Sequence, residues 1–160
     1  MRLIGYLLLL ALIGYGLWPY YDIYRLDAAI NAQDAGSLGQ MVDLDAIRAH
    51  YRKRVAAGIK GVLPAEDSSS VLSWIRQNME RLGDSALDQA ITLDWVRETR
   101  RDAVTRPTGQ SPPYLLAGID FAFFESYDRF LIRIGELGAG ETHVRLSLVD
   151  GRWKLTDIVP

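Results

Sequence analysis

An uncharged run near the N-terminus constrains this chain more than any other feature. No charged residue occurs between Leu3 and Tyr21, and Arg2 alone precedes them. As a helix these 19 residues would span about 28 Å, close to the roughly 30 Å hydrocarbon core of a bilayer. The apolar centre that we expect inside the membrane contains Leu7, Leu8, Leu9, Leu10, Leu12 and Ile13. The sequence therefore predicts a membrane anchor over residues 1–21.

Aromatic residues crowd the far end of this run. Tyr15, Trp18, Tyr20 and Tyr21 follow the aliphatic centre, and rings with a polar tip favour the membrane–water interface. We expect Trp18 to belong to the anchor. Pro19 lacks an N–H donor, so we expect the helix to end there.

A cleaved signal peptide is the alternative interpretation of the same run. Gly14-Tyr15-Gly16 is a poor cleavage site, because apolar Leu17 and Trp18 continue past it. The length of the run suits a span better, so we favour an uncleaved anchor. Arg2 and the free amino group favour an N-terminus in the cytoplasm. We therefore expect a single-pass protein of the cytoplasmic membrane, with its C-terminal domain periplasmic or otherwise extracytoplasmic.

Residues 22–160 suffice for a single domain that needs no disulfide. The absence of cysteine excludes a disulfide framework, a thiol nucleophile and any Cys-based metal site. The formal net charge of the whole chain is only −2, a balance that indicates no particular partner. We expect no nucleic-acid binding, because such domains are usually basic.

Residues 22–104 form a predicted helical half. Apolar residues at helical spacing predict helices over residues 23–30, 44–55, 71–82, 86–91 and 93–104. Turn formers fill residues 31–39. Asp43 suits the N-cap of the second helix, because its carboxylate can accept first-turn N–H groups. Thr92 can cap the last helix in the same way.

Residues 105–114 form a predicted linker, and residues 115–160 a sheet half. Three of the six prolines fall between residues 105 and 113. The period then changes to two, and each predicted strand has one apolar face. These faces are Ile119–Phe121–Phe123, Phe130–Ile132–Ile134, Val144–Leu146–Leu148 and Trp153–Leu155. Asp150-Gly151 predicts a two-residue hairpin turn.

Helices followed by a four-stranded antiparallel meander predict an α+β fold. The helices must cover the apolar face of the sheet. By analogy, a cone-like arrangement of the nuclear-transport-factor-2-like or cystatin-like kind would achieve this.

Three stretches of sequence resemble a known family. The first runs from Pro19-Tyr20-Tyr21 through Ala28-Ala29 and Asp34 to Leu38; the second is Val42-Asp43-Leu44 with Ile47-Arg48; the third is Tyr127-Asp128-Arg129-Phe130 with Gly151-Arg152-Trp153-Lys154-Leu155, Ile158 and Pro160. In their order and spacing they resemble the bacterial domain of unknown function (DUF) 2939 family, over nearly the whole chain. The resemblance implies a small membrane-anchored bacterial protein, and it assigns no activity and no catalytic residue.

Candidate catalytic residues are few. His50 stands among basic residues on a predicted helix, where we expect it to be solvated, and His143 lies on the polar side of a strand. Neither has a metal-binding spacing, so we expect no metal, cofactor or catalytic residue. Asp43 and Arg48 suggest either a binding site or, as we favour, a cap with an ion pair that fixes the helix against the sheet.

Other polar and aromatic residues also have structural interpretations. Trp153 suits a core anchor, and we expect a structural role for Arg129. Five charged residues alternate with the apolar ones, which predicts the solvent face of the sheet: Asp120, Arg129, Arg133, Arg145 and Lys154. Two basic runs, Arg48 to Lys60 and Arg97 to Arg106, are candidates for contact with anionic lipid headgroups.

Two functions are consistent with these observations. The first is a non-enzymatic interaction or scaffold domain in the bacterial envelope, anchored in the bilayer and meeting an envelope protein partner. The second is a small-ligand-binding or enzymatic domain with a pocket between the helices and a concave sheet. We favour the first, because the sequence contains no catalytic constellation.

Overall fold

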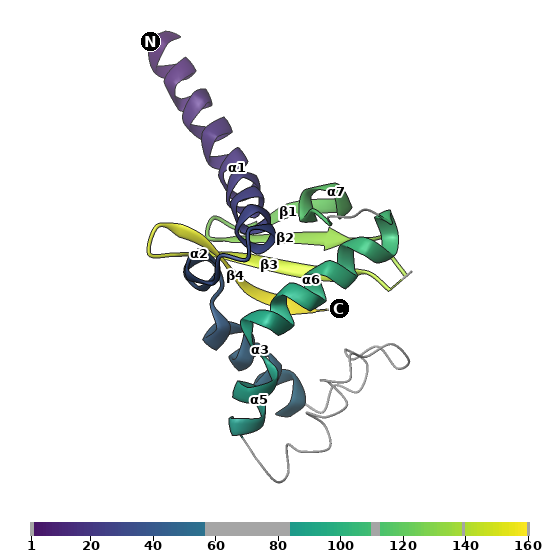
Figure 1. Cartoon of the computed structure of the whole chain (residues 1–160). Helices are drawn as coiled ribbons and strands as arrows, with labels where there is room; N and C mark the ends of the chain where they lie inside the picture. Colours follow the sequence, from purple (N-terminus) through teal and green to yellow (C-terminus); the bar gives the residue numbers. More distant parts are fainter. Residues whose placement is uncertain (1, 57–83, 110–112, 139, 160) are drawn as a thin grey trace.

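The computed structural model describes residues 2–56, 84–109, 113–138 and 140–159 (Figure 1). Its helices are α1 (Arg2–Asn31), α2 (Ala35–Met41), α3 (Leu44–Ala56), α5 (Asp84–Ala90), α6 (Leu93–Thr108) and α7 (Leu115–Gly118). Its strands are β1 (Ile119–Ser126), β2 (Arg129–Ile134), β3 (Thr142–Val149) and β4 (Arg152–Val159). The helix expected over residues 71–82 lies outside the described residues.

The four strands form one antiparallel sheet in the order β1-β2-β3-β4. This meander, preceded by helices, confirms the predicted α+β class. Asp150 and Gly151 have φ angles of 53° and 70°, as the predicted type I′ hairpin turn requires. Strand β4 lies at one edge of the sheet. The connection from α2 to α3 covers this edge, where the Asp43 N–H donates to the Leu155 carbonyl at 2.8 Å.

The hydrophobic core lies between one face of the sheet and helices α1 and α6. From α1 it takes Ile23, Leu26 and Ile30, and from α6 Val96 and Val104. The strands contribute side chains no more than 2 % exposed: Phe130, Ile132, Ile134, Val144, Leu146, Trp153, Leu155 and Ile158. At about 25 cal/mol per Å² of buried apolar surface, this layer is the main source of stability.

The expectation that Pro19 ends the first helix is wrong, because α1 continues through it to Asn31. Proline removes one backbone hydrogen bond, and tertiary contacts on both sides offset this loss. Pro19 is itself buried, Tyr20 contacts Phe130 and Ile23 is fully buried. The division into an anchor over residues 1–21 and one domain over 22–160 stays a prediction, and no break in the helix marks it.

Two other boundaries differ from expectation. Residues 31–39 are not all turn: Asp34 accepts hydrogen bonds from the Gly36 and Ser37 N–H groups and begins α2, which buries Leu38 completely. Helix α6 was expected to end at residue 104, but it runs to Thr108 and stops at Gly109, whose φ is 64°. A proline in the last turn loses one bond at an end that already frays, so the helix tolerates it.

The predicted apolar face of β1 is wrong for two of its three residues. Phe121 and Phe123 are 51 % and 41 % exposed, whereas Ala122 and Phe124 pack against the core. The register of β1 against β2 shifts between Ile119 and Phe121. Such a bulge inserts one residue and moves every following side chain to the opposite face.

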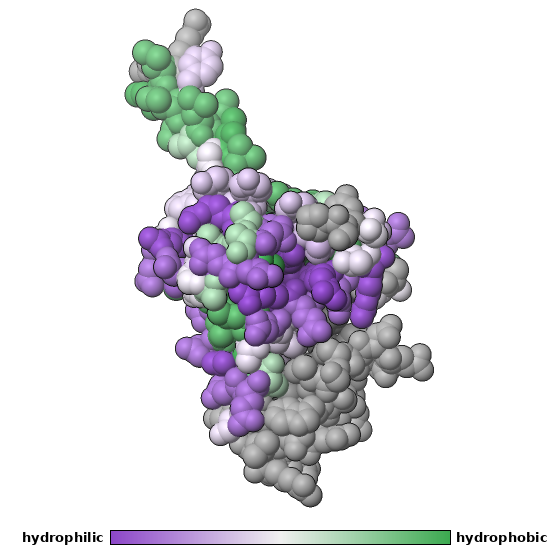
Figure 2. Space-filling model, in the orientation of Figure 1, coloured by the Kyte–Doolittle hydropathy of each residue, from purple (hydrophilic) through white to green (hydrophobic). Residues whose placement is uncertain are grey.

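The N-terminal part of α1 projects from the rest of the molecule (Figure 1). The six predicted anchor aliphatics, residues 7–10, 12 and 13, are 48–73 % exposed, and Trp18 is 38 % exposed. Figure 2 shows this projection as a hydrophobic rod beside a body whose visible face is mainly hydrophilic. Helix α1 is long and apolar enough to cross a membrane, and only 6 % of its apolar 18-residue stretch is buried in the molecule. A signal sequence would satisfy the same criterion.

Candidate functional site

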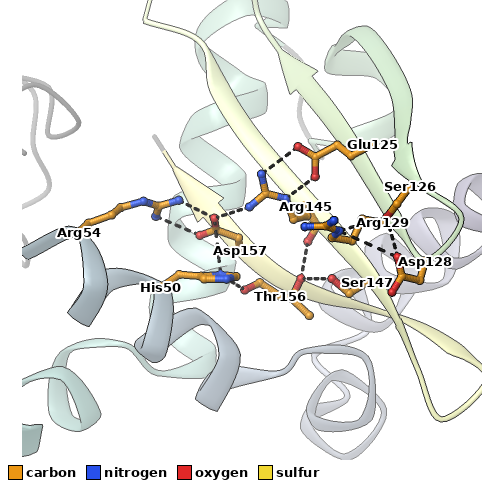
Figure 3. A network of polar contacts seen from close by, with 10 residues as sticks. All are labelled: His50, Arg54, Glu125, Ser126, Asp128, Arg129, Arg145, Ser147, Thr156 and Asp157. Carbon is orange, nitrogen blue, oxygen red and sulfur yellow. Dashed lines mark hydrogen bonds and ion pairs between the residues drawn. The ribbon is translucent and has the colours of Figure 1, made fainter. Parts of the chain in front are cut away.

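Arg145 joins three strands on the face of the sheet away from the core (Figure 3). From β3 its guanidinium donates to both carboxylate oxygens of Glu125 on β1, at 2.6 and 3.0 Å. It also donates to Asp157 Oδ2 on β4, at 3.3 Å. The hydrogen bonds from Arg145 lower the pKa of Glu125, and the same bonds raise the pKa of Arg145. Both groups are therefore ionised at neutral pH.

Asp157 connects this network to helix α3. Its side chain is only 3 % exposed, and Arg54 donates to both of its oxygens. His50 Nδ1 lies 3.7 Å from Asp157 Oδ2 and 3.1 Å from the Thr156 carbonyl oxygen. His50 is thus partly buried against β4, and the expectation of a solvated histidine is wrong, because α3 packs along the edge of β4.

Within the part of the chain that the structure describes, the hydroxyl groups near His50 do not complete a nucleophilic triad. Thr156 Oγ1 shares a hydrogen bond with Ser147 Oγ at 2.8 Å, whereas the contact of His50 with Thr156 is to the carbonyl oxygen. A general base must reach the hydroxyl that it activates. The arrangement is therefore suited to holding α3 on the sheet, with two arginines neutralising Asp157.

A second polar cluster closes the turn between β1 and β2. The Ser126 hydroxyl donates to Asp128 Oδ1 at 2.6 Å, and Arg129 Nε donates to Ser126 Oγ at 3.1 Å (Figure 3). Tyr127, between them, is 79 % exposed. Arg129 thus stabilises a turn that presents an aromatic ring to the surroundings.

Asp43 and Arg48 do not form one site. Asp43 Oδ1 accepts the Ala46 N–H at 2.9 Å, so it caps α3 as predicted. Arg48 donates to the Ile91 carbonyl at 3.0 Å and to the Asp88 carbonyl at 3.1 Å, at the end of α5. The expectation of an ion pair that fixes this helix against the sheet is wrong: Arg48 pairs with Asp45 within α3 and with Asp88 on α5, so it holds α3 to α5.

Trp153 is 2 % exposed in the core. Its ring centroid lies 6.4 Å from that of Tyr15 and 5.9 Å from that of Phe124. Beside it a small pocket is lined by Asp22, Arg25, Ser37, Gln40, Met41, Arg152 and Trp153. Its volume of about 30 Å³ suits a few waters rather than a metabolite.

A buried ion pair was missed by the sequence reasoning. Arg100 on α6 donates to Asp27 Oδ1 at 2.8 Å, and the other oxygen of Asp27 accepts the Leu115 N–H at 2.8 Å. The two side chains are 4 % and 1 % exposed. Asp27 lies four residues after Ile23 and three before Ile30, on the apolar face of α1. A carboxylate at that helical spacing was the signal that could have indicated a buried charge.

The charged residues expected on the solvent face of the sheet are mostly paired. Arg133 pairs with Asp120, and Arg129 approaches Asp128 at 4.0 Å. Among the described residues, no group of three His, Cys, Asp or Glu side chains is placed to hold a metal ion.

A family model described as "Protein of unknown function (DUF2939)" matches residues 8–99. The chain belongs to the DUF2939 family. The match covers the first two of the resembling stretches, with Asp43 and Arg48, and ends before the third, with Arg129 and Trp153. No curated protein and no solved structure matches this DUF2939 chain.

Proposed function

We propose that this DUF2939 protein is a single-pass membrane protein whose α+β domain is a non-enzymatic interaction or scaffold domain at the membrane surface. The observation that carries the proposal is the projecting half of α1 (Figures 1 and 2). A row of aliphatic side chains exposed by about half or more is unfavourable in water and favourable in hydrocarbon.

Contacts of Tyr15 favour a retained anchor over a cleaved signal. Its hydroxyl donates to the Tyr127 carbonyl, and its ring stacks on Phe124 with centroids 5.7 Å apart. Cleavage after Gly16 would remove Tyr15 from these contacts and divide a continuous helix. The anchor segment therefore also contributes to the packing of the domain.

Charged substitutions in the projecting helix test the anchor. We expect the Leu9→Arg/Leu10→Arg variant to leave the membrane fraction, because each arginine at the centre of a span costs about 2.5–3.5 kcal/mol. Leu137→Arg is the control, since Leu137 is 71 % exposed and lies outside α1. The readout is retention in membranes after an alkaline wash, with intact mass measured on the same sample. Release of the wild type, or loss of the first 16 residues from the 18.0 kDa chain, would refute the anchor.

The proposed location is the bacterial envelope, with the domain outside the cytoplasmic membrane. Its support is the charge of Arg2 and the amino group on the short side of the run. A cysteine placed at Leu137 should react with a membrane-impermeant maleimide in intact cells, because the proposal places the domain outside the cytoplasmic membrane. The chain has no other cysteine, so the label reports on this position alone. Labelling only after lysis would place the domain in the cytoplasm.

A pocket between the helices and the sheet would favour the alternative, a ligand-binding or enzymatic domain. Within the described residues the inner face of the sheet is filled by core side chains, and the pocket beside Trp153 is small. Neither observation favours a ligand-binding or enzymatic domain over the proposed function.

A further inference from the structure

The part of α1 that is free of the domain is too short to cross a bilayer. It runs from Leu3 to Gly14, 12 residues, which reach about 18 Å against a hydrocarbon core of about 30 Å. Tilting the helix would shorten its reach along the membrane normal further. About 12 Å of the span must therefore come from residues after Gly14.

Those residues already contact the sheet. Tyr15 bonds to the Tyr127 carbonyl and lies against Phe124 and Trp153. Tyr20 meets Phe130 with ring centroids 5.1 Å apart. No linker separates the anchor from the domain, because α1 is continuous. If residues 15–21 lie at membrane depth, the end of the sheet that touches them must lie at the interface.

The chemistry of that end suits a bilayer interface. Tyr127 is 79 % exposed at the tip of the β1–β2 turn, and tyrosine is enriched at headgroup depth. The Arg129 side chain, nearby, is 56 % exposed, and exposed arginines are attracted to anionic headgroups. On α1 itself, Leu17 and Tyr21 are 61 % and 60 % exposed. In contrast, α3, which carries Arg48 to Arg54 of the first basic run, lies at the end of the molecule away from the projecting helix (Figure 1).

We propose that the β1–β2 turn is a second bilayer-contact site, with Tyr127 seated among the lipid headgroups beside α1. The domain then contacts the membrane in one fixed orientation instead of moving freely at the end of a flexible linker. This inference rests on the proposed anchor.

Depth measurements on the full chain in vesicles test the proposal. The chain has no cysteine, so Tyr127→Cys, Leu137→Cys and Leu10→Cys each give one site for a nitroxide spin label. Leu137 is the matched control, because it is 71 % exposed at the opposite end of β2. The Tyr127→Cys change keeps the contact with Tyr15, which uses the backbone carbonyl of residue 127. Mixed phosphatidylcholine and phosphatidylglycerol vesicles are the probe membrane.

Collision rates with oxygen, which enters hydrocarbon, and with a water-soluble nickel complex give the depth of each label. We expect the label at residue 10 to favour oxygen and the label at residue 137 to favour nickel. The label at residue 127 should collide with nickel several-fold less often than that at residue 137. Equal nickel collisions at residues 127 and 137, with residue 10 in hydrocarbon, would overturn this inference and leave the anchor standing. A label at residue 10 that favours nickel would overturn the anchor and this inference together.

Discussion

The buried pair of Asp27 and Arg100 should respond asymmetrically to loss of either partner. Desolvation raises the pKa of Asp27 to about 6, against the opposing effects of Arg100 and of the Leu115 N–H. The carboxyl can therefore become neutral by taking up a proton. Arg100, whose pKa burial lowers, remains charged at neutral pH. Removing the acid should cost more than removing the base.

The expected magnitude follows from this burial. Asp27→Asn leaves a guanidinium 4 % exposed without a counter-ion, which costs about 3–5 kcal/mol of unfolding free energy. That is a large part of the roughly 5–15 kcal/mol typical of a domain. Arg100→Met should cost less, and less at pH 5 than at pH 7, because protonated Asp27 no longer needs its partner. Asp27→Leu/Arg100→Met should be more stable than Asp27→Asn, since it leaves no unpaired charge.

Urea unfolding of the full chain in detergent, followed by tryptophan fluorescence, measures these differences. The wild type, Asp27→Asn, Arg100→Met and Asp27→Asn/Arg100→Met form a double-mutant cycle at each pH, and the coupling free energy between the two positions is the quantity of interest. Costs below about 1 kcal/mol for Asp27→Asn, or no coupling, would show that the pair is solvated and refute the reasoning.

Three further predictions use the same unfolding assay. From about pH 4 to pH 7 the wild type should lose about 2.4 kcal/mol of unfolding free energy relative to Asp27→Leu/Arg100→Met, because the carboxyl of Asp27 ionises with a pKa near 3.8 when unfolded and about 6 when folded; a parallel pH dependence would contradict this. Asp43→Ala should cost about 1 kcal/mol by removing the cap of α3, and Asp43→Asn much less; equal costs would exclude capping. Gly118→Ala should cost about 1–3 kcal/mol, because its Cβ would lie 2.8 Å from Ile134 Cγ2. Gly39→Ala, with nothing within 4 Å of the added Cβ, is the control and should be neutral or stabilising.

The parts of the fold that depend on local pattern could be predicted. Period-two alternation identified the strands, Asp150-Gly151 the last hairpin, and Asp43 the start of α3. Pro19 was misjudged because a local rule was outweighed by packing that joins α1 to residues more than 100 positions away. The phase of β1 could not be read, because the bulge after Ile119 is a property of the pairing with β2.

The candidate site was less predictable than the fold. Arg145 lies on the face of the sheet where it was expected. Its partners Glu125 and Asp157 come from two other strands, and the sequence did not indicate them. Arg54 reaches the same carboxylate from α3. Such a cluster depends on strand register and on how a helix docks at a sheet edge, and spacing within one segment does not encode either.

The contact between Tyr15 and Trp153 has a consequence for biosynthesis. Among the elements that the structure describes, helix α1 leaves the ribosome before all others, and β4 leaves after them. The aromatic cluster that joins them cannot close until β4 has been synthesised, so a nascent chain anchored as proposed would hold Tyr15 without its contact to Trp153 until then. Contacts of such sequence separation slow folding. Loss of β4, for example through a premature stop codon, would leave the proposed anchor attached to a polypeptide unable to complete its core.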